Sequence, residues 1–267
     1  MTFLKSSRAA RETKTSFGWK LALALALGLA TNLAQSETGR TWAFASRDAE
    51  GHSLHGKIVA DALSSTLNAA NLDLVIRCLE EQARDKNEGE SKLFAGPSLK
   101  SAVNFIDREQ KKVLNYAGDA DVSPAGRYRC LKHFGALLFA AQDFYSRSNY
   151  VELQAERMTE KFGKGGFDPY NIELADWNTL NNAFKQNGSI VYTSASQPKE
   201  TAEQGKASLA ASTYYKVARE LAVRETSRQW ELLETLIKHR YHERAITILA
   251  ALKQASCPAS EPDLLDN

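Results

Sequence analysis

The spacing of apolar residues constrains the fold of this chain more than any other feature. Over most of the sequence, apolar side chains recur every three or four positions, which places them along one face of an α-helix. Such stripes include Ile58–Leu67, Leu72–Leu79, Ala102–Leu114, Cys130–Ala141, Leu209–Ile237 and Ala245–Leu252. The pattern predicts an all-α protein, a single-domain multi-helix bundle of roughly six to eight helices.

Breaks in this pattern predict where the helices end. Residues 163–169 contain three glycines and a proline, which is typical of a loop. Asn187–Gly188 predicts a turn, and the β-branched stretch 190–193 favours a strand. Residues 177–184 predict a short helix, and a long helix is expected from Lys206 onward.

The first 36 residues have the order of features found in a secretory signal. Five basic residues precede the apolar run Leu21–Ala30, and Ala34 and Ser36 then place small side chains where a signal peptidase cleaves. A transmembrane anchor would need about 20 apolar residues, and polar residues end this run earlier. We therefore expect a signal peptide over 1–36, a mature domain over 37–267, and a secreted or periplasmic protein.

Charge and cysteine content narrow the function classes. The sequence has 34 Lys and Arg residues and 32 Asp and Glu residues. Five of the basic residues and one of the acidic residues lie in the first 36 positions, so the remaining chain has a net charge of −2. No run of Lys and Arg could track phosphates, so we expect no nucleic-acid partner. Cys78, Cys130 and Cys257 lie in the part predicted to be exported, where one disulfide could form. The sequence leaves the pairing open.

The most specific stretch of the sequence runs from residue 130 to residue 153. Over Gln142–Leu153 it reads Gln-Asp-Phe-Tyr-Ser-Arg-Ser-Asn-Tyr-Val-Glu-Leu. This stretch resembles the signature of the heterokaryon-incompatibility C (HET-C) family, Leu-His-x-x-Gln-Asp-Phe-Tyr-Ser-His-Ser-Asn-Trp/Tyr-Val-Glu-Leu. The resemblance implies an all-α fold similar to that of the zinc-dependent phospholipases C.

Shorter stretches resemble other parts of the same family in the same order. Residues 50–58, Glu-Gly-His-Ser-Leu-His-Gly-Lys-Ile, are similar to its N-terminal Glu-Gly…His-Gly-Asp-Ile. Residues 215–226 are similar to its late helix, His-x-x-Ala…Leu-Ala-x-x-Ala-Thr, and residues 168–170 with Trp177 also fit. The resemblance covers about 45 to 240, nearly all of the predicted mature chain.

The resemblance implies a zinc site among the helices, in which the metal polarises a phosphodiester and lowers the pKa of an attacking water. Three ligands are expected four residues apart on the central helix, a spacing that aims them at one side. Only Asp143 is retained there, between Phe139 and Arg147. On the late helix, Tyr215 and Arg219 stand where the family has a histidine and a glutamate.

His55 and Asp143 are the ligands that remain, and Asp143 is also the candidate catalytic residue. His52, three residues before His55, could share a metal with it. The alternative for His55 is a solvated histidine at a helix start. Phenylalanine cannot ligate, and arginine does not shed its proton, so zinc is possible but a multi-zinc site is not expected.

Arginine at two expected ligand positions suggests another use of the same space. Asp143 followed by Arg147 is the favourable order for an ion pair within one helix. We therefore predict that Arg147, helped by Arg219, neutralises Asp143 where relatives hold a metal. The alternative for Arg219 is a solvent-facing side chain.

Several other residues have both a functional and a structural interpretation. Phe144, Tyr145 and Tyr150 could line a lipid-facing cleft, although aromatic residues at this spacing more often belong to a core. His133 is expected to be structural or exposed. Asp107 is expected on a solvated face together with its neighbours Arg108 and Glu109.

The altered ligand set favours a catalytically impaired protein, a pseudoenzyme that binds phospholipid at a membrane surface or an envelope protein. The alternative is an active zinc-dependent phospholipase C that hydrolyses phospholipid phosphodiesters. Such an enzyme would combine His55 and Asp143 with some of His52, Asp61, Asp107 or Glu220. The sequence specifies neither the lipid nor the oligomeric state.

Overall fold

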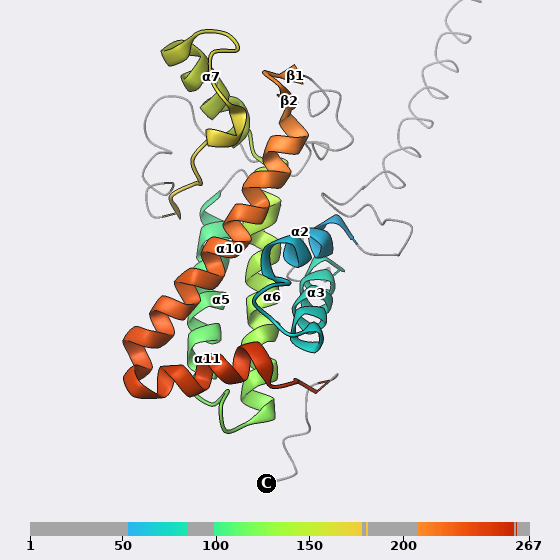
Figure 1. Ribbon diagram of the computed structural model, residues 1–267, viewed down its shortest axis with the longest axis vertical. Coiled ribbons are helices and arrows are strands. Elements are labelled where there is room, and N and C mark those ends of the chain that lie inside the picture. Colours follow the sequence, from blue (N-terminus) through green and yellow to red (C-terminus); the bar gives the residue numbers. More distant parts are fainter. Residues whose placement is uncertain (1–52, 85–98, 178–179, 181–207, 259, 261–267) are drawn as a thin grey trace, which may run out of the picture. The chain divides into compact units, whose positions relative to one another are not determined.

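The computed structural model describes residues 53–84, 99–177, 180, 208–258 and 260 (Figure 1). The predicted signal peptide over 1–36, the candidate ligand His52 and the predicted strand at 190–193 lie outside these residues, as do the turn at 187–188 and most of the short helix at 177–184.

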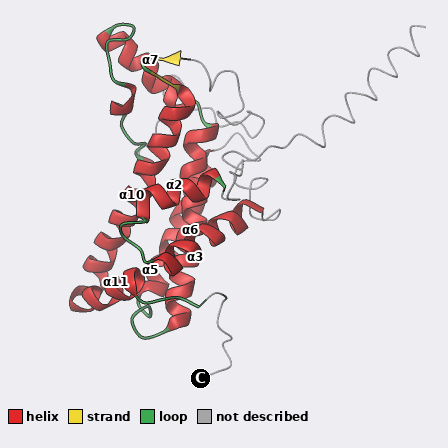
Figure 2. Cartoon of the chain, turned by 45° about the vertical axis from the view of Figure 1, so that its right-hand side comes forward, coloured by secondary structure: helices red, strands yellow, loops and turns green. Residues whose placement is uncertain are grey.

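Helices contain 78% of the described residues, which confirms the all-α prediction (Figure 2). The α-helices are α2 (Leu54–Leu63), α3 (Ala69–Arg84), α5 (Leu99–Ala117), α6 (Pro124–Arg147), α7 (Tyr150–Phe162), α10 (Tyr214–Tyr241) and α11 (Ala245–Gln254). Two 3-10 turns, η1 (Pro169–Asn171) and η2 (His242–Arg244), and an antiparallel pair of short strands, β1 (Ser208–Leu209) and β2 (Ser212–Thr213), complete the described structure. In these parts of the chain, no helix combines the length and apolar character needed to cross a membrane.

Helix α6 is the central element of the fold. Helices α3, α5 and α10 pack against it, and α2 lies between α3 and α10 (Figure 1). Every residue from Phe134 to Arg147 is buried, so this part of α6 has neighbours on all sides. Polar side chains there have no access to water and need partners inside the protein.

The contact between α3 and α6 depends on a glycine. A Cβ atom on Gly135 would lie 2.6 Å from the carbonyl oxygen of Val75 and 3.1 Å from the Cβ of Cys78. A larger residue at this position would force the two helices apart. The start of α6 is fixed by Ser123, whose hydroxyl accepts a hydrogen bond from the Gly126 backbone N–H at 3.2 Å.

The long C-terminal helix begins later than the apolar spacing predicts. Leu209 lies in β1 and not in a helix, and α10 starts at Tyr214. Ala210 adopts a positive φ of 50°, which turns the chain between the two strands. Thr213 then caps α10 with its side chain, and this cap sets the first helical residue. The predicted helix from Ala245 is confirmed as α11.

Candidate functional site

His55 lies in the protein interior, at the contact between α2 and α6. Ser53 caps α2 by accepting a hydrogen bond from the Gly56 N–H at 3.1 Å, so His55 falls in the first helical turn. Its ring centroid is 5.3 Å from that of Phe139 on α6. The solvated alternative for His55 is therefore wrong, and His55 faces one of the three positions to which the resemblance assigns a ligand.

A chain of buried hydrogen bonds connects His55 to two other helices. His55 Nδ1 lies 2.8 Å from Gln142 Oε1, and Gln142 Nε2 donates to Thr226 Oγ1 at 3.0 Å. The Thr226 hydroxyl donates to the carbonyl oxygen of Ala222 at 2.8 Å. Because Thr226 uses its proton toward Ala222, it must accept from the Gln142 amide, and His55 is then protonated at Nδ1. This arrangement joins α2, α6 and α10.

Asp143 and Arg147 form the ion pair that their spacing predicts. Arg147 Nε donates to Asp143 Oδ1 at 3.2 Å, and the two side chains are 4% and 0% exposed. A charge buried to this extent is very costly unless an opposite charge and hydrogen bonds accompany it. The guanidinium of Arg147 therefore supplies positive charge at the carboxylate that the resemblance treats as a metal ligand.

Arg219 does not have the role predicted for it. It pairs with Asp61 of α2, and both side chains are partly or largely exposed to solvent. The positive charge of Arg219 is thus directed to a surface carboxylate. Asp61 and Asp107, two of the additional ligands considered for an altered zinc site, are both exposed and lie away from the buried face of α6.

These positions do not present a donor set that suits zinc. A zinc site combines three or four imidazole, thiolate or carboxylate donors. Here Phe139 offers no donor and Asp143 is paired with Arg147. His55 donates from Nδ1 to Gln142, which leaves Nε2 as its one possible ligand atom, fewer donors than a zinc site requires. Within the described ranges, no group of three or more His, Cys, Asp or Glu side chains is arranged to hold a metal ion. His52 lies outside those ranges.

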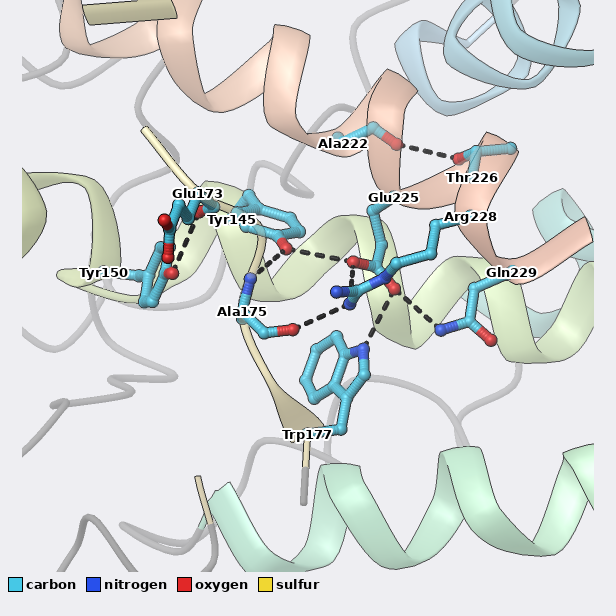
Figure 3. A network of polar contacts seen from close by, with 10 residues as sticks. All are labelled: Tyr145, Tyr150, Glu173, Ala175, Trp177, Ala222, Glu225, Thr226, Arg228 and Gln229. Carbon is cyan, nitrogen blue, oxygen red and sulfur yellow. Dashed lines mark hydrogen bonds and ion pairs between the residues drawn. The ribbon is translucent and has the colours of Figure 1, made fainter. Parts of the chain in front are cut away.

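A second buried carboxylate, Glu225 on α10, is the centre of a larger polar network (Figure 3). Its Oε2 accepts from the Tyr145 hydroxyl at 3.0 Å, and its Oε1 accepts from Trp177 Nε1 at 2.9 Å and Gln229 Nε2 at 2.7 Å. Arg228 forms an ion pair with the same carboxylate. Burial, and next the charge of Glu225, raise the pKa of Tyr145 well above 10, so its hydroxyl remains a donor.

The Glu225 network fastens the segment after η1 to the helices. The backbone N–H of Ala175 donates to the Tyr145 hydroxyl at 3.0 Å, and Arg228 donates to the carbonyl of Ala175 at 2.7 Å (Figure 3). One turn earlier on α10, Arg224 donates to the carbonyls of Tyr170 and Ile172. The network joins α6, α10 and this segment and leaves both Glu225 oxygens bonded, which indicates a structural role.

Glu225 is not among the site residues expected from the sequence, although the sequence carries a signal for it. Glu225 follows Leu221 and Ala222 on the apolar face of α10, and an acidic residue in such a stripe needs a buried partner. Phe144, Tyr145 and Tyr150 belong to the core, as their spacing favours. Phe144 and Tyr145 are fully buried, and their rings are 5.0 Å apart.

A third buried carboxylate, Glu109 on α5, corrects the prediction of a solvated face. Asp107 is exposed as expected, but Glu109 is buried. His133 Nδ1 lies 2.7 Å from one Glu109 oxygen, and Lys112 Nζ lies 3.0 Å from the other. Burial alone would raise the pKa of Glu109, but the hydrogen bonds of His133 and Lys112 lower it to about 2. His133 also stacks on Tyr116, so the structural interpretation of His133 is confirmed.

No protein-family model, curated protein or solved structure matches this chain in comparisons with known proteins. The resemblance to the HET-C family therefore stays a prediction from the stretch around Gln142–Leu153 and the shorter stretches.

Proposed function

We propose that this chain is an exported, HET-C-like pseudoenzyme on a scaffold similar to the zinc-dependent phospholipases C, and that it binds phospholipid at a membrane surface. The observation that carries the proposal is the buried Asp143–Arg147 pair. The resemblance assigns metal ligands to both positions. In this chain the guanidinium of Arg147, a fixed cation next to the remaining carboxylate, takes the place that the metal would have. Such a cation neutralises the carboxylate but cannot lower the pKa of a bound water as zinc does.

The surface that we propose to contact the membrane is the corner formed by Val122 and Ile246. Val122 is 74% exposed in the turn between α5 and α6, and Ile246 is 77% exposed in the first turn of α11. The two lie close together because Asp121 accepts hydrogen bonds from Arg244 at 2.7 Å and from Thr247 at 2.8 Å. Two exposed aliphatic side chains on neighbouring turns suit insertion between lipid headgroups.

The charges around this corner favour headgroups that carry both signs. Three basic and four acidic side chains lie in the last turns of α10, in η2 and in the turn before α6: Lys238, Arg240, Arg244, Glu234, Glu243, Asp119 and Asp121. This balance gives no strong attraction to an anionic surface. We therefore propose a zwitterionic phospholipid such as phosphatidylcholine as the partner.

Metal analysis tests the first part of the proposal. The full chain is purified without chelators and its zinc is measured by plasma mass spectrometry. We expect less than about a tenth of an equivalent, and no hydrolysis of a chromogenic phosphodiester with zinc added. Stoichiometric zinc together with hydrolysis would establish the alternative, an active phospholipase C with an altered ligand set.

Vesicle sedimentation tests the second part. Val122→Asp and Ile246→Asp together should weaken binding to phosphatidylcholine vesicles roughly tenfold or more, since each buried aliphatic side chain contributes about 1.5–3 kcal/mol. Leu232→Asp is the matched control, because Leu232 is 38% exposed on α10 outside this corner and all variants carry the same residues 1–36. Equal binding by all three proteins would refute the proposed surface. Capture of an envelope protein by a chain that binds no vesicles would contradict a lipid partner.

A further inference from the structure

We propose that the outer face of α5 and α6 binds a phosphate group, and that Arg108, Lys112 and Arg129 supply the positive charge that holds it. The site uses none of the residues of the Val122–Ile246 corner, so the inference goes beyond the proposed function and does not depend on it. A lipid headgroup and a soluble phosphate compound share this chemistry.

The centre of the site is the buried carboxylate of Glu109, which is surrounded by more positive charge than it can neutralise. Arg108 Nε and Lys112 Nζ lie 3.2 and 3.0 Å from the same oxygen, Oε1. His133 Nδ1 lies 2.7 Å from the other oxygen. Two full positive charges and an imidazole thus meet a single negative charge. This excess favours a second anion, and both cationic groups bind phosphate oxygens well.

The exposure of these side chains puts the positive charge at the surface. Arg108 and Lys112 are 50% and 41% exposed, whereas Glu109 is only 3% exposed. An anion in the solvent therefore reaches the guanidinium and the ammonium before the carboxylate beneath them. Because Glu109 already orders both groups, less side-chain freedom is lost when an anion binds.

Tyr116 and Arg129 extend the positive face from α5 to α6. Tyr116 lies one turn after Lys112, and its ring stacks on that of His133 with the centroids 5.4 Å apart. The guanidinium carbon of Arg129 lies 5.8 Å from the centroid of the Tyr116 ring, within the range of a cation–π contact. A third cation therefore borders the same surface.

The other acidic residues of the two helices do not offset this charge. Besides Glu109, α5 has one acidic residue, Asp107, and at about 100° per residue it lies on the opposite side of the helix. The one acidic residue of α6, Asp143, lies ten residues beyond His133, about 15 Å further along the axis. The attraction of this face for a phosphate is thus not cancelled by carboxylates of α5 or α6.

An NMR titration of the full chain with inorganic pyrophosphate tests the site. In ¹H–¹⁵N spectra of the wild-type protein, we expect the largest shifts at the amides of Arg108–Lys112 and Arg129–His133. Added salt should weaken the binding, because it screens charges at the surface. The absence of any shift in these two stretches would overturn the proposal.

Matched double variants test which charges bind the phosphate. Arg108→Gln combined with Lys112→Gln should raise the dissociation constant for pyrophosphate roughly tenfold. Lys100→Gln combined with Lys111→Gln is the control, because it removes the same charge from exposed positions on the other side of α5. The control should change the dissociation constant by less than about twofold. An equal loss in both double variants would overturn the proposal.

Arg129→Gln keeps the test independent of folding failure, because Glu109 keeps its contacts with Arg108, Lys112 and His133 in this variant. The dissociation constant for pyrophosphate should rise roughly threefold. An unchanged constant would remove Arg129 from the site.

Sedimentation with phosphatidylglycerol vesicles separates the two sources of phosphate. If the site takes a lipid phosphate, Arg108→Gln with Lys112→Gln should weaken binding to vesicles and to pyrophosphate alike. If it takes a soluble phosphate, only pyrophosphate binding should weaken. Failure of the phosphate site would leave the proposed function untouched, since zinc analysis and binding to phosphatidylcholine through Val122 and Ile246 do not involve these side chains.

Discussion

Two buried carboxylates, Asp143 on α6 and Glu225 on α10, are neutralised in different ways. Asp143 is paired with Arg147, one turn away on the same helix. Glu225, in contrast, is held by donors from α6, α10 and the segment after η1, which lie up to 80 residues away in the sequence. The first arrangement needs only one helix to form. The second needs three parts of the chain to meet, so it contributes more to holding the tertiary structure together.

The largest effect should follow removal of the carboxylate of Glu225. Glu225→Ala leaves Tyr145, Trp177 and Gln229 without an acceptor and Arg228 without its charge partner. We expect a loss of about 4 kcal/mol or more in the free energy of unfolding, measured by urea denaturation. Glu231→Ala, at an exposed position of the same helix, is the control and should change stability by less than about 0.5 kcal/mol. A loss for Glu225→Ala as small as that for Glu231→Ala would contradict the role of Glu225 in holding the tertiary structure together.

Glu109 is intermediate between Asp143 and Glu225 in the origin of its partners. One of its partners, Lys112, lies on its own helix, and another, His133, lies on α6. The pKa of Glu109, about 2 in the folded protein, is below the ordinary value of 4.5. The stabilisation is therefore complete above pH 4.5 and is lost as the pH falls through 4.5 toward 2. The expected loss is about 3 kcal/mol, measured as unfolding free energy against pH. Glu109→Gln should make the unfolding free energy depend less on pH between 4.5 and 2. An unchanged slope in this variant would show that the pKa of Glu109 is not lowered in the folded protein.

The smallest effect is expected for the hydrogen-bond chain from His55. Thr226→Val removes the hydroxyl that accepts from Gln142, without changing the size of the side chain. We expect a loss of about 1–2 kcal/mol, since one buried donor loses its partner. Thr235→Val, on an exposed turn of α10, is the matched control and should have little effect. Equal losses for Thr226→Val and Thr235→Val would contradict a stabilising role of this hydrogen-bond chain.

The features predicted from the sequence are those set by residues close together in the chain. The central stretch of α6, helix α11 and the Asp143–Arg147 pair follow from helical spacing, and the structure confirms them. The role of Arg219 was predicted incorrectly because its partner, Asp61, lies 158 residues away. Leu209 was misplaced because its apolar character fits a short strand as well as a helix.

The candidate site was predictable only in part, for the same reason. His55 and Asp143 come from motifs, but the bond from His55 to Gln142 joins residues 87 positions apart. The Glu225 network joins residues that lie 48 and 80 positions apart in the sequence. The spacing of residues within one helix cannot reveal such contacts. The HET-C resemblance and the zinc ligands remain predictions, and His52 lies outside the described residues.

The central claim is that Arg147 supplies the cation that Asp143 requires, and a double-mutant cycle at these two residues tests it most directly. Arg147→Met should cost about 3–5 kcal/mol in unfolding free energy, because it removes the positive charge that Arg147 places at the buried carboxylate. Asp143→Asn combined with Arg147→Met should recover much of that loss, giving a coupling energy well above 1 kcal/mol. Additive effects of the two substitutions, with Arg147→Met as stable as the wild-type protein, would contradict the claim.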